Sequence, residues 1–208
     1  MIPYLLHPAY FPSVASFAAM VQAEFLWFEA TDNYQKQTYR NRMYLYGSNG
    51  RQTLTVPIKH THHTGRQKYK DVLIENDFDW KKQHWRTLQT AYRTSPFFEF
   101  YEDEIAPLFR QPHTSLFELN LQSIELICEC LQYDLSYQLT ENYKEDYEQE
   151  LKDYRYFINA KVPLPFTIET YKQVFDEKYG YLENLSVLDL LFNEGPRALD
   201  FLESVKLP

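Results

Sequence analysis

Two basic segments of the chain carry residues that could do chemistry. In the first, Arg40 and Arg42 are two residues apart, so on an extended strand their guanidinium groups share a face that could bind phosphate or carboxylate. Lys59 ends the next strand-like run and could join them. A charged edge strand that prevents association between sheets is the alternative. Residues 36–93 hold twelve Lys and Arg but four Asp and Glu, in a chain of net charge −8, which favours the anion site.

The second segment is a helix expected over residues 80–94, with Asp79 as its N-cap. Lys81 and His84 fall on the same side of this helix as its apolar residues. His84 could be a general base near pH 7, and Lys81 could stabilise developing negative charge. Alternatively, both extend to solvent from the first turn. If His84 is catalytic, replacing it by Gln should abolish turnover and leave the melting temperature near that of the wild type.

Three other places in the sequence carry a histidine or an acid that could have a catalytic or metal-binding role. His7 follows an apolar strand expected over residues 2–6, and the carboxyl end of a parallel strand opens toward a crevice; a buried histidine without a role in binding is the alternative. Asp189 lies beside an apolar run, but Ser186-x-x-Asp189 has the spacing of a capping box, so a structural role is favoured. The tract His60-Thr61-His62-His63 lacks Cys, Asp or Glu at ligand spacing, which favours a surface loop over a metal site.

Standard fingerprints of cofactor and nucleophile sites are absent from the sequence. There is no Gly-x-Gly-x-x-Gly, no Walker loop and no Gly-x-Ser-x-Gly. Cys128 and Cys130 are two apart on an expected helix, so their side chains point to different faces and are expected to be reduced structural thiols. We therefore expect no metal and no cofactor.

The elements that position these residues begin with a βαβ unit. An apolar strand, a helix capped by Ser13 and running to about residue 23, and a strand over 24–29 predict two parallel neighbours. Strands over 39–46 and 52–58 flank Gly47-Ser48-Asn49-Gly50, a hairpin signal. The sheet is therefore expected to be small and mixed. A short strand is also expected over 71–75, after a basic loop.

The rest of the chain is expected to be mostly helical, giving an α/β fold with α+β as the alternative. One domain spans 1–208: a sheet-rich part (1–76), helices (77–135), an acidic segment (136–166) that is either a connector or a lid, and C-terminal helices that pack back (167–208). The further helices begin at Ser95-Pro96, run from Ser115 to about 131, and cover 168–177 and 186–202.

Composition sets the broad class. A length of 208 residues with 44% hydrophobic and 24% charged residues suits one globular core. A pI of about 5.3 argues against a nucleic-acid partner. The start lacks the features of a secretory signal, and no window approaches the roughly 18 apolar residues of a transmembrane helix. We expect a cytoplasmic protein whose partner is a small anionic molecule, and the oligomeric state stays open.

Several motifs resemble the WbqC-like protein family, in order and over nearly the whole chain. They are His7-Pro8-Ala9-Tyr10-Phe11-Pro12, Gln35 with Tyr39-Arg40-Asn41-Arg42, the Leu-Thr-Val-Pro-Ile-Lys strand ending at Lys59, Trp80 to Trp85 with Tyr92, Ser95-Pro96-Phe97-Phe98, and the stretch 184–193. One position departs, because the family usually has Gln where His7 stands. The resemblance adds Gln35, Tyr39, Asn41, Tyr10 and Tyr92 as candidate substrate-binding residues.

The resemblance also implies a setting. Members occur in bacteria beside O-antigen biosynthesis genes, and glycine transfer to a sugar has been suggested for the family. We therefore expect a transferase that acts on a nucleotide-, phosphate- or acyl-linked donor, with glycine or another aminoacyl group passed to an amino sugar. The alternative is a non-catalytic binding or scaffold protein of envelope polysaccharide assembly, so the sequence leaves open whether the chain is an enzyme.

Overall fold

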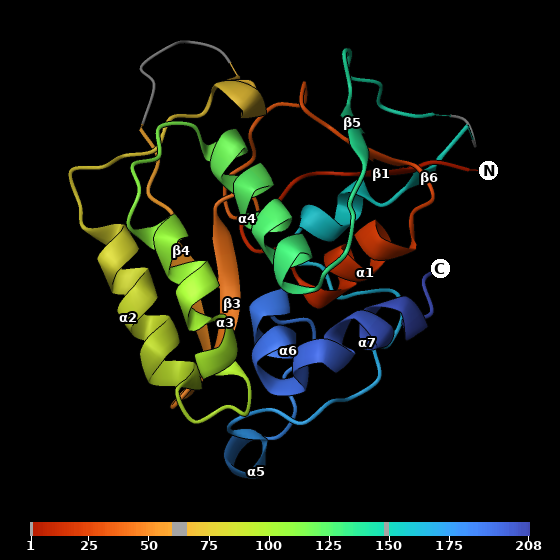
Figure 1. The fold of residues 1–208 in the computed structure, drawn as a ribbon. Coiled ribbons are helices and arrows are strands. Elements are labelled where there is room, and N and C mark those ends of the chain that lie inside the picture. Colours follow the sequence, from red (N-terminus) through yellow and green to blue (C-terminus); the bar gives the residue numbers. More distant parts are fainter. Residues whose placement is uncertain (1, 60–65, 148–149) are drawn as a thin grey trace.

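Four short parallel strands form the sheet that organises the molecule. The computed structural model describes residues 2–59, 66–147 and 150–208. Strand β1 (Tyr4–Leu6) pairs with β2 (Leu26–Phe28) on one side and β6 (Lys152–Asp153) on the other, and β5 (Tyr137–Leu139) pairs with β2. The order is β5-β2-β1-β6, and all four strands run the same way (Figure 1).

The predicted βαβ unit is confirmed. Between β1 and β2 lies α1 (Val14–Gln22), whose N-cap Ser13 accepts a hydrogen bond from the Ser16 amide. Nearly every residue of α1 is buried, because α7 (Ala198–Ser204) packs along it. Gln22 fixes this contact by donating to the carbonyls of Leu202 and Val205. The C-terminal end of the chain therefore stabilises the first crossover.

The predicted hairpin also forms, as a two-stranded sheet of its own. Strands β3 (Arg42–Gly47) and β4 (Gly50–Thr55) pair antiparallel, and Gly50 supplies the positive φ of +94° that the turn needs. The first arm starts later than predicted. Just beyond the ladder, the Val56 amide donates to the Asn41 carbonyl and the Asn41 side-chain amide donates to the Val56 carbonyl, and Arg40 lies outside the strand. The α/β class is thus confirmed, with parallel strands and a hairpin.

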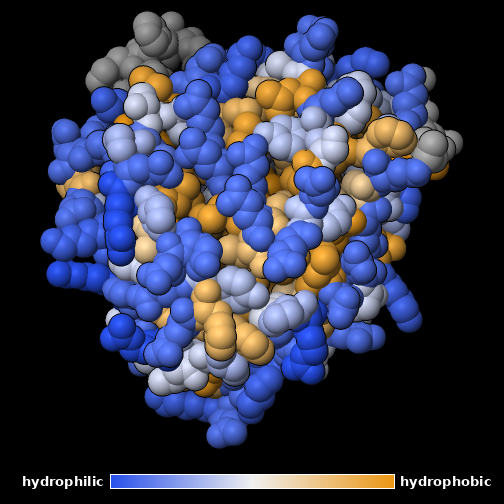
Figure 2. All heavy atoms as spheres, viewed as in Figure 1, coloured by the Kyte–Doolittle hydropathy of each residue, from blue (hydrophilic) through white to orange (hydrophobic). Residues whose placement is uncertain are grey.

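Helices fill the space around the hairpin. They are α2 (Trp80–Tyr92), α3 (Phe98–Ile105), α4 (Leu116–Cys130), α5 (Asp176–Tyr179) and α6 (Val187–Glu194), with short 3₁₀ turns at Tyr69–Asp71, Ala106–Phe109, Arg155–Ile158 and Gly195–Arg197. In Figure 1 the hairpin lies between α2 and α6, and the parallel strands lie on the far side of α4. One continuous apolar core joins these elements, and Figure 2 shows mostly hydrophilic side chains with apolar residues between them on the face seen.

Several predicted boundaries are wrong. Ser95 is not the cap of α3, because its hydroxyl bonds back to the Tyr92 carbonyl. The helix expected over 168–177 is reduced to α5, and the one over 186–202 is broken at Gly195, which has a φ of +55° and precedes Pro196. Residues 71–75 form isolated bridges (Ile58 with Ile74, Leu73 with Ser115) and no strand.

The acidic segment 136–166 is not a connector outside the fold. It supplies two of the four parallel strands, β5 and β6, at opposite edges of the sheet. Among the described residues, no helix is long and apolar enough to cross a bilayer.

Candidate functional site

The carboxyl ends of the parallel strands bring polar side chains to one edge of the sheet. His7 follows β1, Glu29 follows β2, Thr140 follows β5, and Arg155 comes two residues after β6. Because the strands are parallel, these positions share an edge, which is where α/β proteins bind ligands. Glu29 joins neighbouring strand ends by accepting from the Thr140 hydroxyl at 2.9 Å. His7 therefore lies at the carboxyl end of a parallel strand, as the sequence predicted.

Three buried groups meet beside β1. Nε2 of His7 lies 3.0 Å from Oδ2 of Asp32, and the same oxygen accepts from Nη2 of Arg40 at 2.7 Å. Nη2 of Arg40 is also 2.8 Å from Nε2 of His7. The Arg40 side chain is completely buried, with its guanidinium 5.2 Å from the centre of the Tyr69 ring. A buried guanidinium needs a carboxylate partner, and Asp32 provides it.

The protonation of this cluster follows from its charges. Burial lowers the pKa of His7 below its usual 6.5, and the Arg40 charge lowers it further against the opposing influence of Asp32. Burial alone would raise the pKa of Asp32, but the hydrogen bond and charge of His7 and the charge of Arg40 outweigh it, so the pKa is lowered. At neutral pH the cluster therefore holds a neutral imidazole, a carboxylate and a guanidinium.

A second ion-pair network lies at the ends of β2 and β6. Arg155 binds both carboxylate oxygens of Asp153 through Nε at 2.9 Å, and its Nη1 is 3.6 Å from Oε2 of Glu29. Its guanidinium also donates to the carbonyls of Lys144 and Glu145, at 2.8 and 3.0 Å. Glu29 is fully buried, and its Oε2 has no hydrogen-bond partner within the described residues.

One pocket of about 410 Å³ joins the two networks, and we call it the edge pocket. Its charged lining consists of His7, Asp32, Arg40, Asp153 and Arg155, and its rim carries Gln35, Tyr143, Tyr156 and Asn159. Two atoms of this lining, Nδ1 of His7 and Nε of Arg40, are buried without a hydrogen-bond partner in the described part of the chain. A pocket of this kind can bind a small polar molecule.

The sequence-predicted anion site divides into two places. Arg40 and Gln35 line the edge pocket, whereas Arg42 and Asn41 line a different hollow beside the hairpin. The prediction that both arginines share one strand face is wrong, because β3 begins at Arg42. Lys59 is exposed and lines neither hollow, so it does not join either arginine.

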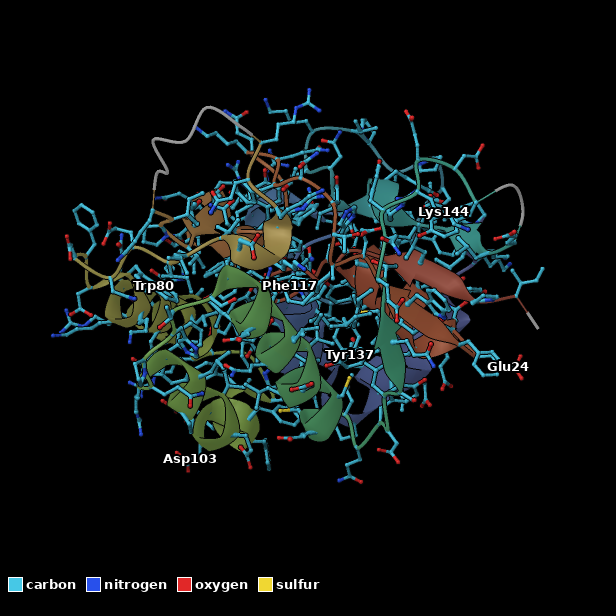
Figure 3. All side chains as sticks on the ribbon, turned by 90° about the horizontal axis from the view of Figure 1, so that it is seen from above. Glu24, Trp80, Asp103, Phe117, Tyr137 and Lys144 are labelled. Carbon is cyan, nitrogen blue, oxygen red and sulfur yellow. The ribbon has the colours of Figure 1, made fainter. Side chains whose placement is uncertain are left out.

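The predicted catalytic pair is not at the edge pocket. His84 is buried, its Nδ1 is 3.1 Å from the hydroxyl of Tyr10, and burial lowers its pKa to about 4. Lys81 donates from Nζ to the Gln111 carbonyl at 2.8 Å. Neither residue lines the edge pocket or the hollow beside Arg42. Figure 3 places Trp80, which contacts the His84 ring, and Lys144, which accepts from Arg155, on opposite sides of the molecule.

The remaining candidates support the core. Tyr39 is buried, with its ring 5.4 Å from that of Tyr44, and its backbone bonds Tyr10 and Ile158. Tyr92 donates to Oδ1 of Asp189 at 2.7 Å. The Asp189 carboxylate caps no helix: it accepts from Tyr92, Tyr171 and Gln173, while the Ser186 amide bonds the Tyr44 carbonyl. The structural role expected of Asp189 thus holds with different partners.

Possible metal ligands occur in the described residues and in the histidine tract. Within the described residues there is no group of three or more His, Cys, Asp or Glu that could hold a metal ion. The histidine tract at 60–63 lies outside the described residues.

Sequence reasoning missed four residues of the site, Glu29, Asp32, Asp153 and Arg155. Glu29 had a usable signal, because it ends an expected strand next to the one that precedes His7. Asp32 follows three residues later in the same loop. Asp153 and Arg155 had no such signal in the sequence, because the strand that positions them, β6, is only two residues long and exposed.

The fold and the edge pocket together define an α/β protein with a pocket lined by charged residues at the carboxyl edge of a parallel sheet. Within that class the chain belongs to the WbqC-like protein family, whose model matches residues 7–161 and so includes His7, Asp32, Arg40 and Arg155. It is similar to "Uncharacterized protein Rv1507c" of Mycobacterium tuberculosis (strain ATCC 25618 / H37Rv), 30% identical over 196 residues, which covers 81% of this chain and 83% of the relative. No solved structure matches the chain.

Proposed function

We propose that the protein is a transferase that binds an anionic sugar or acyl substrate in the edge pocket. The observation that carries this proposal is the meeting of His7, Asp32 and Arg40 with Arg155 at the carboxyl ends of parallel strands, in one pocket. Asp32 and Asp153 balance the two guanidinium charges, but Nε of Arg40 has no hydrogen-bond partner in the described residues and can donate to an incoming carboxylate or phosphate.

The rim of the pocket suits a sugar. Tyr143 and Tyr156 both line it and are 46% and 44% exposed, which is a large aromatic surface to leave in water. An aromatic face packs against the apolar face of a pyranose ring, and Gln35 and Asn159 offer amides for its hydroxyl groups. The setting in surface polysaccharide synthesis rests on the family resemblance alone.

His7 takes the role that the sequence suggested for His84. Nε2 of the neutral His7 imidazole contacts both Asp32 and Arg40, so the tautomer decides its role: when Nε2–H donates to Asp32, Nδ1 is left to accept a proton, the arrangement by which a carboxylate orients a catalytic histidine. In acyl transfer to an amino sugar, the amine nitrogen bonds to the acyl carbon while the bond from that carbon to the leaving group breaks. The proton lost by the amine passes to His7 and then to the departing group, and Arg40 stabilises the oxyanion.

A thermal-shift screen of amino sugars, sugar phosphates and acyl or aminoacyl donors tests the proposal. Saturable stabilisation by one of them, lost in Gln35→Ala and Tyr156→Ala, is the expected result, since both side chains are exposed and their removal leaves the fold intact. Lys81→Gln is the matched control and should bind as the wild type does. No response to any member of the screen, together with binding to an envelope protein, would favour the scaffold alternative.

With a substrate in hand, His7→Gln separates two roles. Gln is the usual family residue here and can still bond Asp32 or Arg40, but it cannot take up a proton. Loss of turnover at unchanged affinity supports proton transfer by His7. Full turnover in His7→Gln would contradict it and leave His7 as a residue that positions Asp32 and Arg40.

A further inference from the structure

A second hollow, of about 670 Å³, lies beside the hairpin and is not used by the edge pocket. We call it the hairpin pocket. Its lining consists of Tyr34, Lys36, Gln37, Asn41 and Arg42, of Thr55 at the end of β4 with residues 56–58, and of Glu75 and Phe78. Its volume falls in the range of pockets that hold a nucleotide-sized ligand.

The charge in the hairpin pocket is basic and incompletely paired. Arg42 and Lys36 are its cations, and Glu75 is its one carboxylate. Arg42 has no ion pair within the described residues, and its Nε is buried there without a hydrogen-bond partner. Asn41 donates to the Val56 carbonyl at 3.0 Å, which leaves its buried Oδ1 free to accept. Desolvated groups without partners are costly unless a ligand completes them.

The rim adds an aromatic surface. Phe78 lines the pocket and is 68% exposed. Tyr34 lines it as well; burial raises the pKa of Tyr34 to about 12 against the charges of Arg40 and Arg42, so its phenol remains a neutral donor. A planar ring bearing negatively charged groups matches this combination of an exposed phenyl ring and nearby cations.

The hairpin pocket is connected to the edge pocket. A small intervening hollow of about 480 Å³ is lined by Tyr34, which also lines the hairpin pocket, and by Asp32, Gln35 and Tyr143, which also line the edge pocket. Arg66 lines the intervening hollow. The strip 32–37 thus borders all three, with Lys36 as its cation and Asp32 as its carboxylate.

We infer that the hairpin pocket binds the nucleoside diphosphate part of a nucleotide-linked amino sugar, whose sugar extends along the strip 32–37 into the edge pocket. Arg42 and Lys36 bind the diphosphate, Phe78 stacks on the base, and Glu75 and the Asn41 oxygen accept from ribose hydroxyl groups. This assignment rests on the proposed function for the identity of the sugar, but the binding of a nucleoside diphosphate can be tested without it.

Isothermal titration calorimetry of the full chain with UDP and with ADP tests this inference, with uridine and inorganic pyrophosphate as the separate halves. We expect at least one diphosphate to bind and each half to bind more weakly. Arg42→Gln should weaken binding about 10- to 100-fold, the loss of one charge-assisted contact. Lys36→Gln and Phe78→Ala should each weaken it about 3- to 10-fold. Arg86→Gln removes the same charge from the exposed face of α2 and should bind as the wild type does.

The outcomes are separable from those for the edge pocket. Failure of both diphosphates to bind, wild-type affinity in Arg42→Gln and Lys36→Gln, or equal weakening in Arg86→Gln would each overturn the inference. Phe78 and Lys36 are exposed, so their variants report binding even if Arg42→Gln unfolds. If diphosphate binding is lost in these variants while Gln35→Ala and Tyr156→Ala affect no sugar or acyl ligand, the hairpin pocket stands and the proposed transferase site fails.

Discussion

Two buried carboxylates, Asp32 and Asp189, have opposite surroundings. Asp32 is paired with a guanidinium and an imidazole, lines the edge pocket, and has a lowered pKa. Asp189, a residue of α6, is completely buried and accepts from two tyrosines and a glutamine, with no cation paired to it in the described residues. Burial raises its pKa to about 6, despite these hydrogen bonds.

The difference separates the proposed binding site from a structural cluster. Around Asp189 both oxygens are used: Oδ1 by Tyr92, and Oδ2 by Tyr171 and Gln173. Around Asp32 the neighbouring His7 and Arg40 each keep a buried atom without a partner. Unused hydrogen-bonding capacity next to a cavity indicates a place for a ligand, whereas a completed network indicates a fixed core.

Removing the Arg40 cation should give the largest effect. Arg40→Gln leaves the Asp32 carboxylate buried without its guanidinium, so we expect the free energy of unfolding to fall by about 3–5 kcal/mol in urea denaturation. The double variant with Asp32→Asn should recover part of the loss, since no charge is then left alone. A loss below about 1 kcal/mol in Arg40→Gln would show that Asp32 does not depend on the pair.

The pH dependence of stability should report Asp189. Its pKa rises from 3.8 in the unfolded chain to about 6 in the folded one, so the folded state binds the proton more tightly. The resulting stabilisation is complete below pH 4 and is lost as the pH rises through 6, a difference of about 3 kcal/mol. Urea unfolding at several pH values, compared with Asp189→Asn, isolates this contribution. Parallel pH profiles for the two proteins would contradict it.

The two buried histidines differ in the same way as the two carboxylates, because His7 lines the edge pocket and His84 lies in the core. His84→Gln should lower stability by about 1–3 kcal/mol at pH 7 through the disturbed contact with Tyr10, and leave ligand binding unchanged. The folded pKa of about 4 lies below the ordinary 6.5, so the wild type should also lose stability as the pH falls from 6.5 to 4. This acid sensitivity, absent in His84→Gln, has the opposite sign to that of Asp189.

Lys81 should give the smallest effect. It is only partly buried, and its one described contact is with the Gln111 carbonyl, so Lys81→Gln should change the free energy of unfolding by less than about 0.5 kcal/mol. Turnover and ligand affinity should also match the wild type. A strong loss of activity in this folded variant would return Lys81 to the catalytic site.

The sequence predicts those parts of the fold whose signals are local. The βαβ unit follows from apolar runs broken by His7-Pro8 and capped by Ser13, and the hairpin follows from the Gly-Ser-Asn-Gly turn. β5 and β6 could not be found in this way, because strands of three and two residues with exposed side chains have no detectable period, and their pairing is decided by β1 and β2.

The candidate site was predictable only in part for the same reason. His7 and Arg40 could be named, but their meeting depends on Arg40 lying before β3 with its side chain buried in the core, whereas the sequence pattern placed it on a strand face. The apolar stripe of α2 was correct, and it is this burial that makes His84 a core residue. Periodicity shows which residues are inside, whereas only the tertiary structure shows which of them border a cavity.

The pairing of β6 with β1 has a consequence for the order of folding. Lys152 pairs with Tyr4, and Tyr137 pairs with Leu26, so each late strand closes a very long loop of chain. Contacts of such high sequence separation form slowly. The hairpin and the helices can form early, but Arg155 and Asp153 reach the edge of the sheet only when the chain returns. The edge pocket is therefore assembled last, and a chain cut before residue 137 would expose both sides of the β1–β2 pair to other molecules.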